Sequence, residues 1–230
     1  MSSRQFALPD GINVEIVKRS SSRNLRLTIS NDGRVRVSIP KWAAYKTGYD
    51  FALSKLDWIK KSKPSKDNLI NGQAIGKSHH LVLMQADVQK ISTRVKGSEA
   101  VVAYPRGLAS ESPEVQKAAS LVSKRALKKQ AENLLPQRLK QLAADYGYNY
   151  SSVRVKPLKS RWGSCDYEKN IILNIYLMLL PWDLIDYVCL HELSHTVVMK
   201  HGEDFWLEVG KSRPNHKQLR KELRSYRAII

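Results

Sequence analysis

Apolar and polar residues alternate along much of the segment from Asn13 to Pro40. From Leu25 to Ile29 and again from Val35 to Ile39 every second residue is apolar, which is the pattern of strands with one buried face. Between these two segments, Asn31-Asp32-Gly33 has the composition of a tight turn. The sequence therefore predicts a β-hairpin in this region.

Three further segments before residue 108 are short, rich in β-branched residues and bounded by glycine or polar residues. One helix interrupts the strands, because apolar residues stand three and four positions apart over residues 48–61. We therefore expect a mostly antiparallel, β-rich N-terminal subdomain over residues 1–108. Its additional strands are expected at residues 80–83, 90–95 and 100–104.

Beyond residue 113 the apolar period becomes helical and continues to Gly147, with an expected kink at Pro136. Strand patterns follow at residues 152–158, 161–165 and 171–177, and then a helical pattern at 182–200. Two short helical patterns lie around residues 205–209 and 216–226. This succession indicates an α+β fold with a second domain over residues 109–230.

The composition is that of a globular protein, with 42% hydrophobic and 26% charged residues among 230. The most apolar stretch, Ile171 to Trp182, is too short to cross a bilayer. The N-terminus has no apolar segment of the kind that secretory signals contain, and the two cysteines form no CxxC pair. We therefore expect a cytoplasmic protein with no membrane partner.

A net charge of +18 is the strongest compositional signal. Such a chain attracts phosphates, nucleotides or nucleic acid over long distances. Arg26, Arg34 and Arg36 belong to the polar face of the predicted hairpin, so one side of this sheet is expected to be basic. The alternative is that the basic residues only keep the surface solvated.

The helix expected over residues 182–200 contains His191-Glu192-Leu193-Ser194-His195, an HExxH motif. At 3.6 residues per turn the two histidines lie on one face, where both imidazoles can bind the same zinc ion. The glutamate of such a motif is the base that takes a proton from the metal-activated water. The alternative, a helix with two surface histidines, is disfavoured by the apolar residues Val188 and Val198 on either side of the motif.

Catalytic zinc sites commonly have three protein ligands, and His201 is the preferred third ligand. Imidazole suits zinc, and Gly202 allows the chain to turn just after the helix. The carboxylates of Glu203, Asp204 and Glu208 are rival candidates, because some HExxH enzymes take their third ligand from a later helix.

Four segments stand out together: Arg161-Trp162-Gly163-Ser164-Cys165, Ile172-Leu173-Asn174, Asp186 to His195, and His201 with Phe205-Trp206. In these segments the chain resembles the YgjP-like metal-dependent hydrolases, which are zinc metallopeptidases related to the SprT-like and Wss1-like proteases. The N-terminal half matches more loosely. Ser194 is a departure, because small apolar residues are common there in the family.

The resemblance implies a zincin-like fold for the second domain and a role for each motif. His191, His195 and His201 become the zinc ligands and Glu192 the catalytic base. The strand containing Trp162, Gly163 and Ser164 becomes the edge of the cleft, where it can hold an extended substrate by main-chain pairing. The alternative is that Trp162 packs in the core and Gly163 marks a bulge.

These features predict a zinc metallopeptidase that acts on a peptide or protein substrate. The same family has been associated with UTP pyrophosphatase activity, and the basic sheet would suit a triphosphate, although the chain has no glycine-rich phosphate loop. A third hypothesis is a nucleic-acid-associated protease, in which the positive surface binds the nucleic acid. The sequence does not indicate an oligomeric state.

Overall fold

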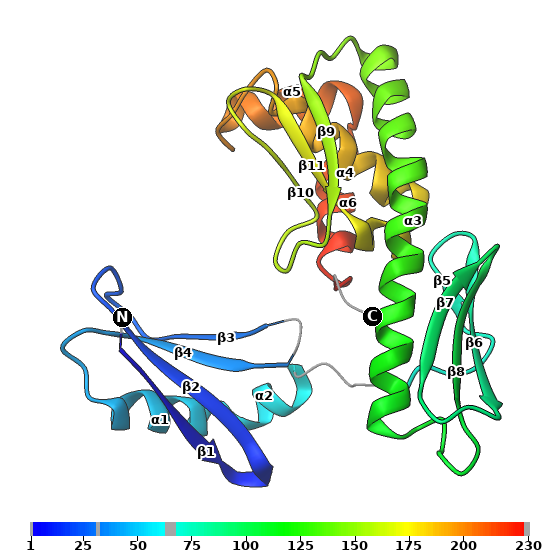
Figure 1. Cartoon of the computed structure of the whole chain (residues 1–230). Coiled ribbons are helices and arrows are strands. Elements are labelled where there is room, and N and C mark those ends of the chain that lie inside the picture. Colours follow the sequence, from blue (N-terminus) through cyan, green and yellow to red (C-terminus); the bar gives the residue numbers. More distant parts are fainter. Residues whose placement is uncertain (1, 31–32, 63–67, 228–230) are drawn as a thin grey trace. The chain divides into compact units, whose positions relative to one another are not determined.

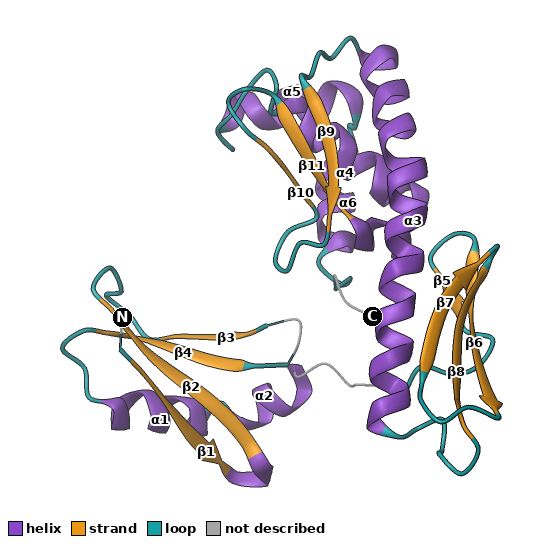
Figure 2. Cartoon of the chain, in the orientation of Figure 1, coloured by secondary structure: helices purple, strands orange, loops and turns teal. Residues whose placement is uncertain are grey.

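The computed structural model describes residues 2–30, 33–62 and 68–227, and the chain divides into two compact units, Met1–Lys66 and Asp67–Ile230. Figure 1 follows the chain through its helices and strands, and Figure 2 shows both kinds of element in each unit. The predicted α+β class is confirmed.

The first unit contains one four-stranded sheet with the order β1-β2-β4-β3. The strands β2 and β4 are parallel, and the two outer pairs are antiparallel. Leu27 of β3 lies opposite Val37 of β4, so the predicted hairpin is confirmed, while Asn31 and Asp32 of its turn lie outside the described residues. The elements are β1 (Ser3–Leu8), a 3-10 turn η1 (Pro9–Gly11), β2 (Ile12–Arg19), β3 (Arg26–Ile29), β4 (Val35–Pro40), α1 (Tyr45–Ser54) and α2 (Leu56–Ser62).

The apolar face of this sheet packs against α1. Gly48 makes the close approach possible, because a Cβ atom there would lie 2.7 Å from Cγ2 of Ile16. On the other face Arg26 and Arg36 are exposed, and Arg36 pairs with Glu15 at 2.8 Å. An acidic residue therefore interrupts the basic face that the sequence predicts.

The second unit begins with another four-stranded sheet, in the order β5-β6-β8-β7. Its central pair is again parallel and its outer pairs antiparallel, so it repeats the topology of the first sheet. Most pairs in both sheets are antiparallel, as the sequence predicts. The strands are β5 (Ala74–Ile75), β6 (His79–Ala86), β7 (Ser92–Lys96) and β8 (Glu99–Pro105).

The sequence places a domain boundary after residue 108, whereas the two compact units meet at residues 66 and 67. The reason is that the second sheet shares one core with the helix that follows it. Gln130 of this helix is buried, donates a hydrogen bond to the carbonyl of Ile75 at 2.8 Å, and accepts one from the amide of Lys77 at 2.6 Å. The sheet is thus bound to the helix by polar as well as apolar contacts.

That helix, α3 (Pro113–Tyr146), has 34 residues and continues through Pro136. It ends at Gly147, whose φ of 74° is the left-handed conformation that glycine adopts readily. Figure 1 shows the second sheet beside the first half of α3 and the remaining elements beside its second half. In the described part of the chain, no helix combines the length and the apolar character needed to cross a membrane.

The remaining elements form a small three-stranded sheet and three helices. The sheet has the order β10-β11-β9, so β10 lies at an edge. The predicted helix over 182–200 is shorter than expected, because regular helix ends at Ser194 and irregular turns follow. The elements are β9 (Ser152–Lys156), β10 (Gly163–Cys165), β11 (Asn170–Asn174), a 3-10 helix η2 (Ile175–Leu179), α4 (Trp182–Ser194), α5 (Glu203–Ser212) and α6 (His216–Leu223).

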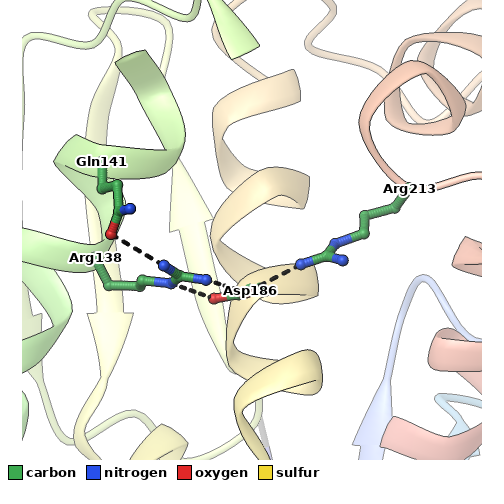
Figure 3. Close-up of polar contacts among 4 residues, drawn as sticks. All are labelled: Arg138, Gln141, Asp186 and Arg213. Carbon is green, nitrogen blue, oxygen red and sulfur yellow. Dashed lines mark hydrogen bonds and ion pairs between the residues drawn. The ribbon is translucent and has the colours of Figure 1, made fainter. Parts of the chain in front are cut away.

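A buried ion cluster fixes α4 against its neighbours (Figure 3). Asp186, in the middle of α4, accepts two hydrogen bonds from Arg138 of α3, at 2.7 and 2.6 Å. Arg213, just beyond α5, donates a third at 3.0 Å, and Gln141 holds the other side of the Arg138 guanidinium at 3.0 Å. This cluster connects three parts of the second unit at one carboxylate.

Candidate metal centre

The HExxH motif lies at the C-terminal end of α4. His191 and Glu192 belong to its last turn, and His195 follows as the residue that caps the helix, still with helical backbone angles. The family departure at Ser194 is accommodated, because its buried hydroxyl donates to the carbonyl of Leu190 at 2.8 Å and lies 3.3 Å from the hydroxyl of Tyr148. The motif therefore has the helical geometry that its spacing predicts.

The structure brings the three predicted histidines together. His191, His195 and His201 each offer a ring nitrogen, and these atoms all lie within 4.8 Å of one another. The Nε2 atoms of His191 and His201 are 3.1 Å apart. Two nitrogens bound to one tetrahedral zinc ion are separated by roughly 3.4 Å, so the donor set and its spacing fit this metal.

Two contacts orient the imidazoles. Nδ1 of His195 lies 3.2 Å from the carbonyl of Val198, which leaves Nε2 available as a ligand. The ring of Phe205 is fully buried and lies 4.3 to 4.9 Å, centroid to centroid, from all three imidazole rings. The first turn of α5 thus supplies the packing that holds the histidines together.

The electrostatic environment keeps the histidines neutral, which is the form that binds metal. Burial lowers the pKa of His191 to about 3, with smaller contributions from His195 and His201. Burial also lowers the pKa of His195 and of His201.

Glu192 is a buried carboxyl beside this cluster. Burial raises its pKa to about 8, and the nearby charge of Arg161 opposes the rise. Gly163 of β10 lies directly against it, because a Cβ atom at this position would come within 2.6 Å of Oε1 of Glu192. Only glycine leaves room for the carboxyl at this point.

A cleft of about 630 Å³ opens over the three histidines and Glu192. Trp162, Gly163 and Ser164, the residues expected to bind substrate, line it, and Trp162 also packs against the core. Both sequence interpretations of Trp162 are therefore compatible with its position. Among the described strands β10 pairs only with β11, so its other edge is free to pair with an extended chain.

The rival third ligands lie elsewhere. Glu208 accepts hydrogen bonds from the hydroxyl of Tyr148 at 3.1 Å and from Lys211 at 2.6 Å. Glu203 and Asp204 begin α5, and within the described residues neither carboxylate joins the histidine cluster. The geometry therefore favours His201.

Other residues of the cleft were not predicted. Arg161 precedes β10, Tyr187 lies on α4 one turn before His191, and Arg220 comes from α6. His216 and Arg220 are four residues apart on α6 and both contact the ring of Trp206, so the helical period contained a signal that they share a face. The sequence does not show that this face turns towards the three histidines, because that orientation depends on tertiary packing.

Comparisons with known proteins find one family model and several solved structures that are similar to this chain. The sequence model of the YgjP-like family, described as a metallopeptidase domain, matches residues 23–226. Among solved structures, the metallopeptidase zymogen abylysin of Pyrococcus abyssi is similar at 24% identity, with 42% of this chain and 100% of that chain covered and a TM-score of 0.37. The metallopeptidase zymogen jannalysin of Methanocaldococcus jannaschii is similar at 22% identity, with 40% and 94% covered and a TM-score of 0.35.

No curated protein matches the chain. The family match nevertheless spans nearly the whole sequence and includes the histidine cluster, Glu192 and the strand above them. The expected resemblance is confirmed, and the chain belongs to the YgjP-like metallopeptidase family.

Proposed function

We propose that the protein is a zinc-dependent peptidase in which His191, His195 and His201 hold the ion and Glu192 is the catalytic base. The observation that carries this proposal is the convergence of three neutral imidazoles beside one buried carboxyl in an open cleft. Three imidazoles favour zinc over magnesium or calcium.

Zinc at this site would lower the pKa of a water molecule and polarise the carbonyl of the scissile bond. Glu192 takes the proton of the attacking water on its carboxylate and returns it to the leaving amine nitrogen. Burial suits Glu192 to this exchange, because it brings the pKa of the carboxyl close to neutral pH. Contact with Gly163 limits the positions that the carboxyl can take.

The free edge of β10 is the proposed binding site for the substrate main chain. An extended peptide can add to this edge as a further strand, beside Gly163 and Ser164. Main-chain pairing would hold the peptide along the cleft, and the peptide side chains would contact other residues that line it. Trp162 is proposed to contact one of these side chains.

The test combines metal analysis with one substitution. We expect wild-type protein to bind about one zinc ion and to cleave casein-derived peptides. Glu192→Gln should retain the zinc and lose roughly 100- to 10,000-fold in turnover, because general base catalysis contributes about this factor. The matched control is Glu132→Gln, an exposed glutamate on α3, which should leave zinc content and turnover unchanged.

Three results would contradict the proposal. Full activity in Glu192→Gln would exclude the base, and failure to load any zinc would exclude the metal site. Hydrolysis of UTP without cleavage of any peptide would assign the same centre to a nucleotide. Unchanged zinc content in His201→Ala would remove only the third ligand.

A further inference from the structure

The charges that line the cleft are unbalanced. Arg161 and Arg220 both line it, and Glu192 is the one carboxylate among the described residues that do so. Within the described part of the chain, neither arginine forms an ion pair with an aspartate or glutamate. A substrate therefore meets two cations that form no ion pair with a carboxylate of the described residues.

Arg220 is held in place from α6. Its guanidinium lies over the ring of Trp206, 4.6 Å from the centroid, and this ring also stacks on His216 at 5.7 Å and 13°. A cation–π contact of this kind positions the guanidinium while leaving its N–H groups available as donors. Arg220 and Trp206 also line a neighbouring hollow of about 320 Å³, so together they form a wall between two spaces.

Arg161 is held in place from its main chain. Asn174 is fully buried, and its side-chain amide donates to the carbonyl of Arg161 at 2.8 Å and to that of Leu158 at 2.9 Å. The main chain of Trp162 then pairs with Asn174 at 2.9 Å. This fixes the loop immediately before β10, so the exposed side chain of Arg161 extends from an anchored base.

Both charges lie in the same cleft as the histidine cluster. Arg161 and Arg220 line it together with the three histidines and Glu192. The two arginines come from different elements, and a bound metal ion would add further positive charge between them. A cleft with one sign of charge concentrates and orients ligands of the opposite sign.

We propose that Arg161 and Arg220 bind carboxylate side chains of the substrate, so that the enzyme prefers peptides with acidic residues close to the scissile bond. This inference rests on the proposed peptidase function. Arginine suits the task, because its planar group can donate two parallel hydrogen bonds to one carboxylate.

The test uses two peptides that differ only in charge. One carries glutamate on each side of the scissile bond and the other carries glutamine at the same positions. Binding is measured by calorimetry on zinc-loaded Glu192→Gln protein, and kcat/KM on the wild type. We expect the acidic peptide to be favoured about 10-fold or more in both measurements, since a hydrogen bond to a charged group is worth roughly 1.5–3 kcal/mol.

Substitutions then assign the preference to the two arginines. Arg161→Gln and Arg220→Gln should each reduce it, and the double variant should abolish it. Arg220→Lys should keep part of it, because the charge remains. The matched control is Arg224→Gln, which removes the same charge one turn further along, at the end of α6 and outside the cleft, and should keep the full preference.

The outcomes separate this inference from the proposed function. Equal binding of the two peptides would overturn the inference and leave the peptidase intact. Without cleavage of any peptide the proposed function would fail, yet binding to the Glu192→Gln protein would still report on the arginines. An equal fall in kcat for both peptides in the arginine variants, with KM unchanged, would assign the arginines to the reaction and not to recognition.

UTP distinguishes phosphate from carboxylate as the anion. If UTP binds more tightly than the acidic peptide, and loses that affinity in Arg161→Gln and Arg220→Gln, the arginines serve a triphosphate and the inference is wrong. Weaker binding of UTP than of the acidic peptide supports it. Should Arg220→Gln fail to fold, Arg161→Gln and Arg220→Lys still test the assignment, and an undiminished preference in both would overturn it.

Discussion

The two halves of α4 bury their carboxylates in opposite ways. Asp186, in the middle of the helix, is held by Arg138 and Arg213 (Figure 3). Glu192, six residues later, is equally buried but makes no ion pair within the described residues. Gly163 lies directly against it and leaves room for the carboxyl. One helix thus contains a charge that is neutralised by partners and a carboxyl whose proton is free to move.

A structural acid and a reactive acid can be told apart by the groups that surround them. A buried carboxylate with two guanidinium partners is fixed in position by them, which suits it to joining elements. A buried carboxyl without such partners has a raised pKa and can exchange a proton near neutral pH. Burial alone does not distinguish the two, whereas their partners do.

The largest effect is expected when the partners of the structural acid are left without it. Asp186→Asn removes the charge but leaves Arg138 and Arg213 facing each other, so we expect the free energy of unfolding to fall by about 3–5 kcal/mol. Urea unfolding measures this change. The matched control is Asp183→Asn on the exposed first turn of α4, which should cost less than about 1 kcal/mol.

If the two acids have these separate roles, Asp186→Asn should leave the proposed reaction unchanged. Folded protein should keep the zinc and the kcat/KM of wild type at temperatures where it remains folded. A variant as stable as wild type, or one that is fully folded but inactive, would show that the two halves of α4 are not distinct in this way.

A smaller effect is expected from crowding the reactive acid. Gly163→Ala places a Cβ atom 2.6 Å from Oε1 of Glu192, so the carboxyl has to shift. We expect kcat to fall roughly 10- to 100-fold, because small displacements of a catalytic group are costly. Kinetics on the zinc-loaded variant measure the loss.

Gly210→Ala is the control for this substitution. The added Cβ atom would meet its nearest neighbour, a ring atom of His216, at 3.9 Å, an ordinary contact. The residue lies within α5, where alanine favours the helix by up to about 1 kcal/mol. This variant should be active, and unchanged kcat in Gly163→Ala would mean that the position of Glu192 is set by other contacts.

The last effect builds up gradually with pH and concerns the metal-free protein. The folded pKa of Glu192 is raised from 4.5 to about 8, so the native state holds a proton that the unfolded state has released. Stability from this group is therefore fully present below pH 4.5 and declines as the pH rises towards 8. The expected slope is about 1.4 kcal/mol per pH unit between these values.

Glu192→Gln should remove this slope, since glutamine does not titrate, and Glu132→Gln should keep it. Guanidinium unfolding of metal-free protein between pH 5 and 7.5 gives both curves. The histidines of the unfolded chain also take up protons in this range, near the ordinary imidazole pKa of 6.5, but the difference between wild type and Glu192→Gln isolates the one carboxyl. Parallel curves for these two proteins would contradict a raised pKa at Glu192.

The sequence predicts what is encoded locally. The HExxH motif and His201 lie within eleven residues of one another. Helical periodicity places His191 and His195 on one face, and the short segment after α4 brings His201 back to them. The hairpin of β3 and β4 was equally local. The alternation of apolar and polar residues did not predict β1, because only Phe6 and Leu8 of that strand turn towards the core.

Contacts between distant segments were not predictable. Arg138 and Asp186 are 48 residues apart, and no pattern in the sequence pairs them. The sequence also gave no sign that the second sheet repeats the topology of the first, or that it shares a core with α3. Gly163 was singled out by family resemblance, but its contact with Glu192 emerged only from the packing of β10 on α4.

The second sheet and the elements around the histidine cluster both pack on α3, and this affects how the second unit unfolds. The second sheet covers one part of this helix and the elements around the histidine cluster cover another, so loss of either uncovers apolar residues on which the other depends. Such an arrangement favours one cooperative transition, in which amide protons of β8 and α4 become exchangeable together. The proposed metal centre therefore depends for its stability on a sheet that contributes no residue to it.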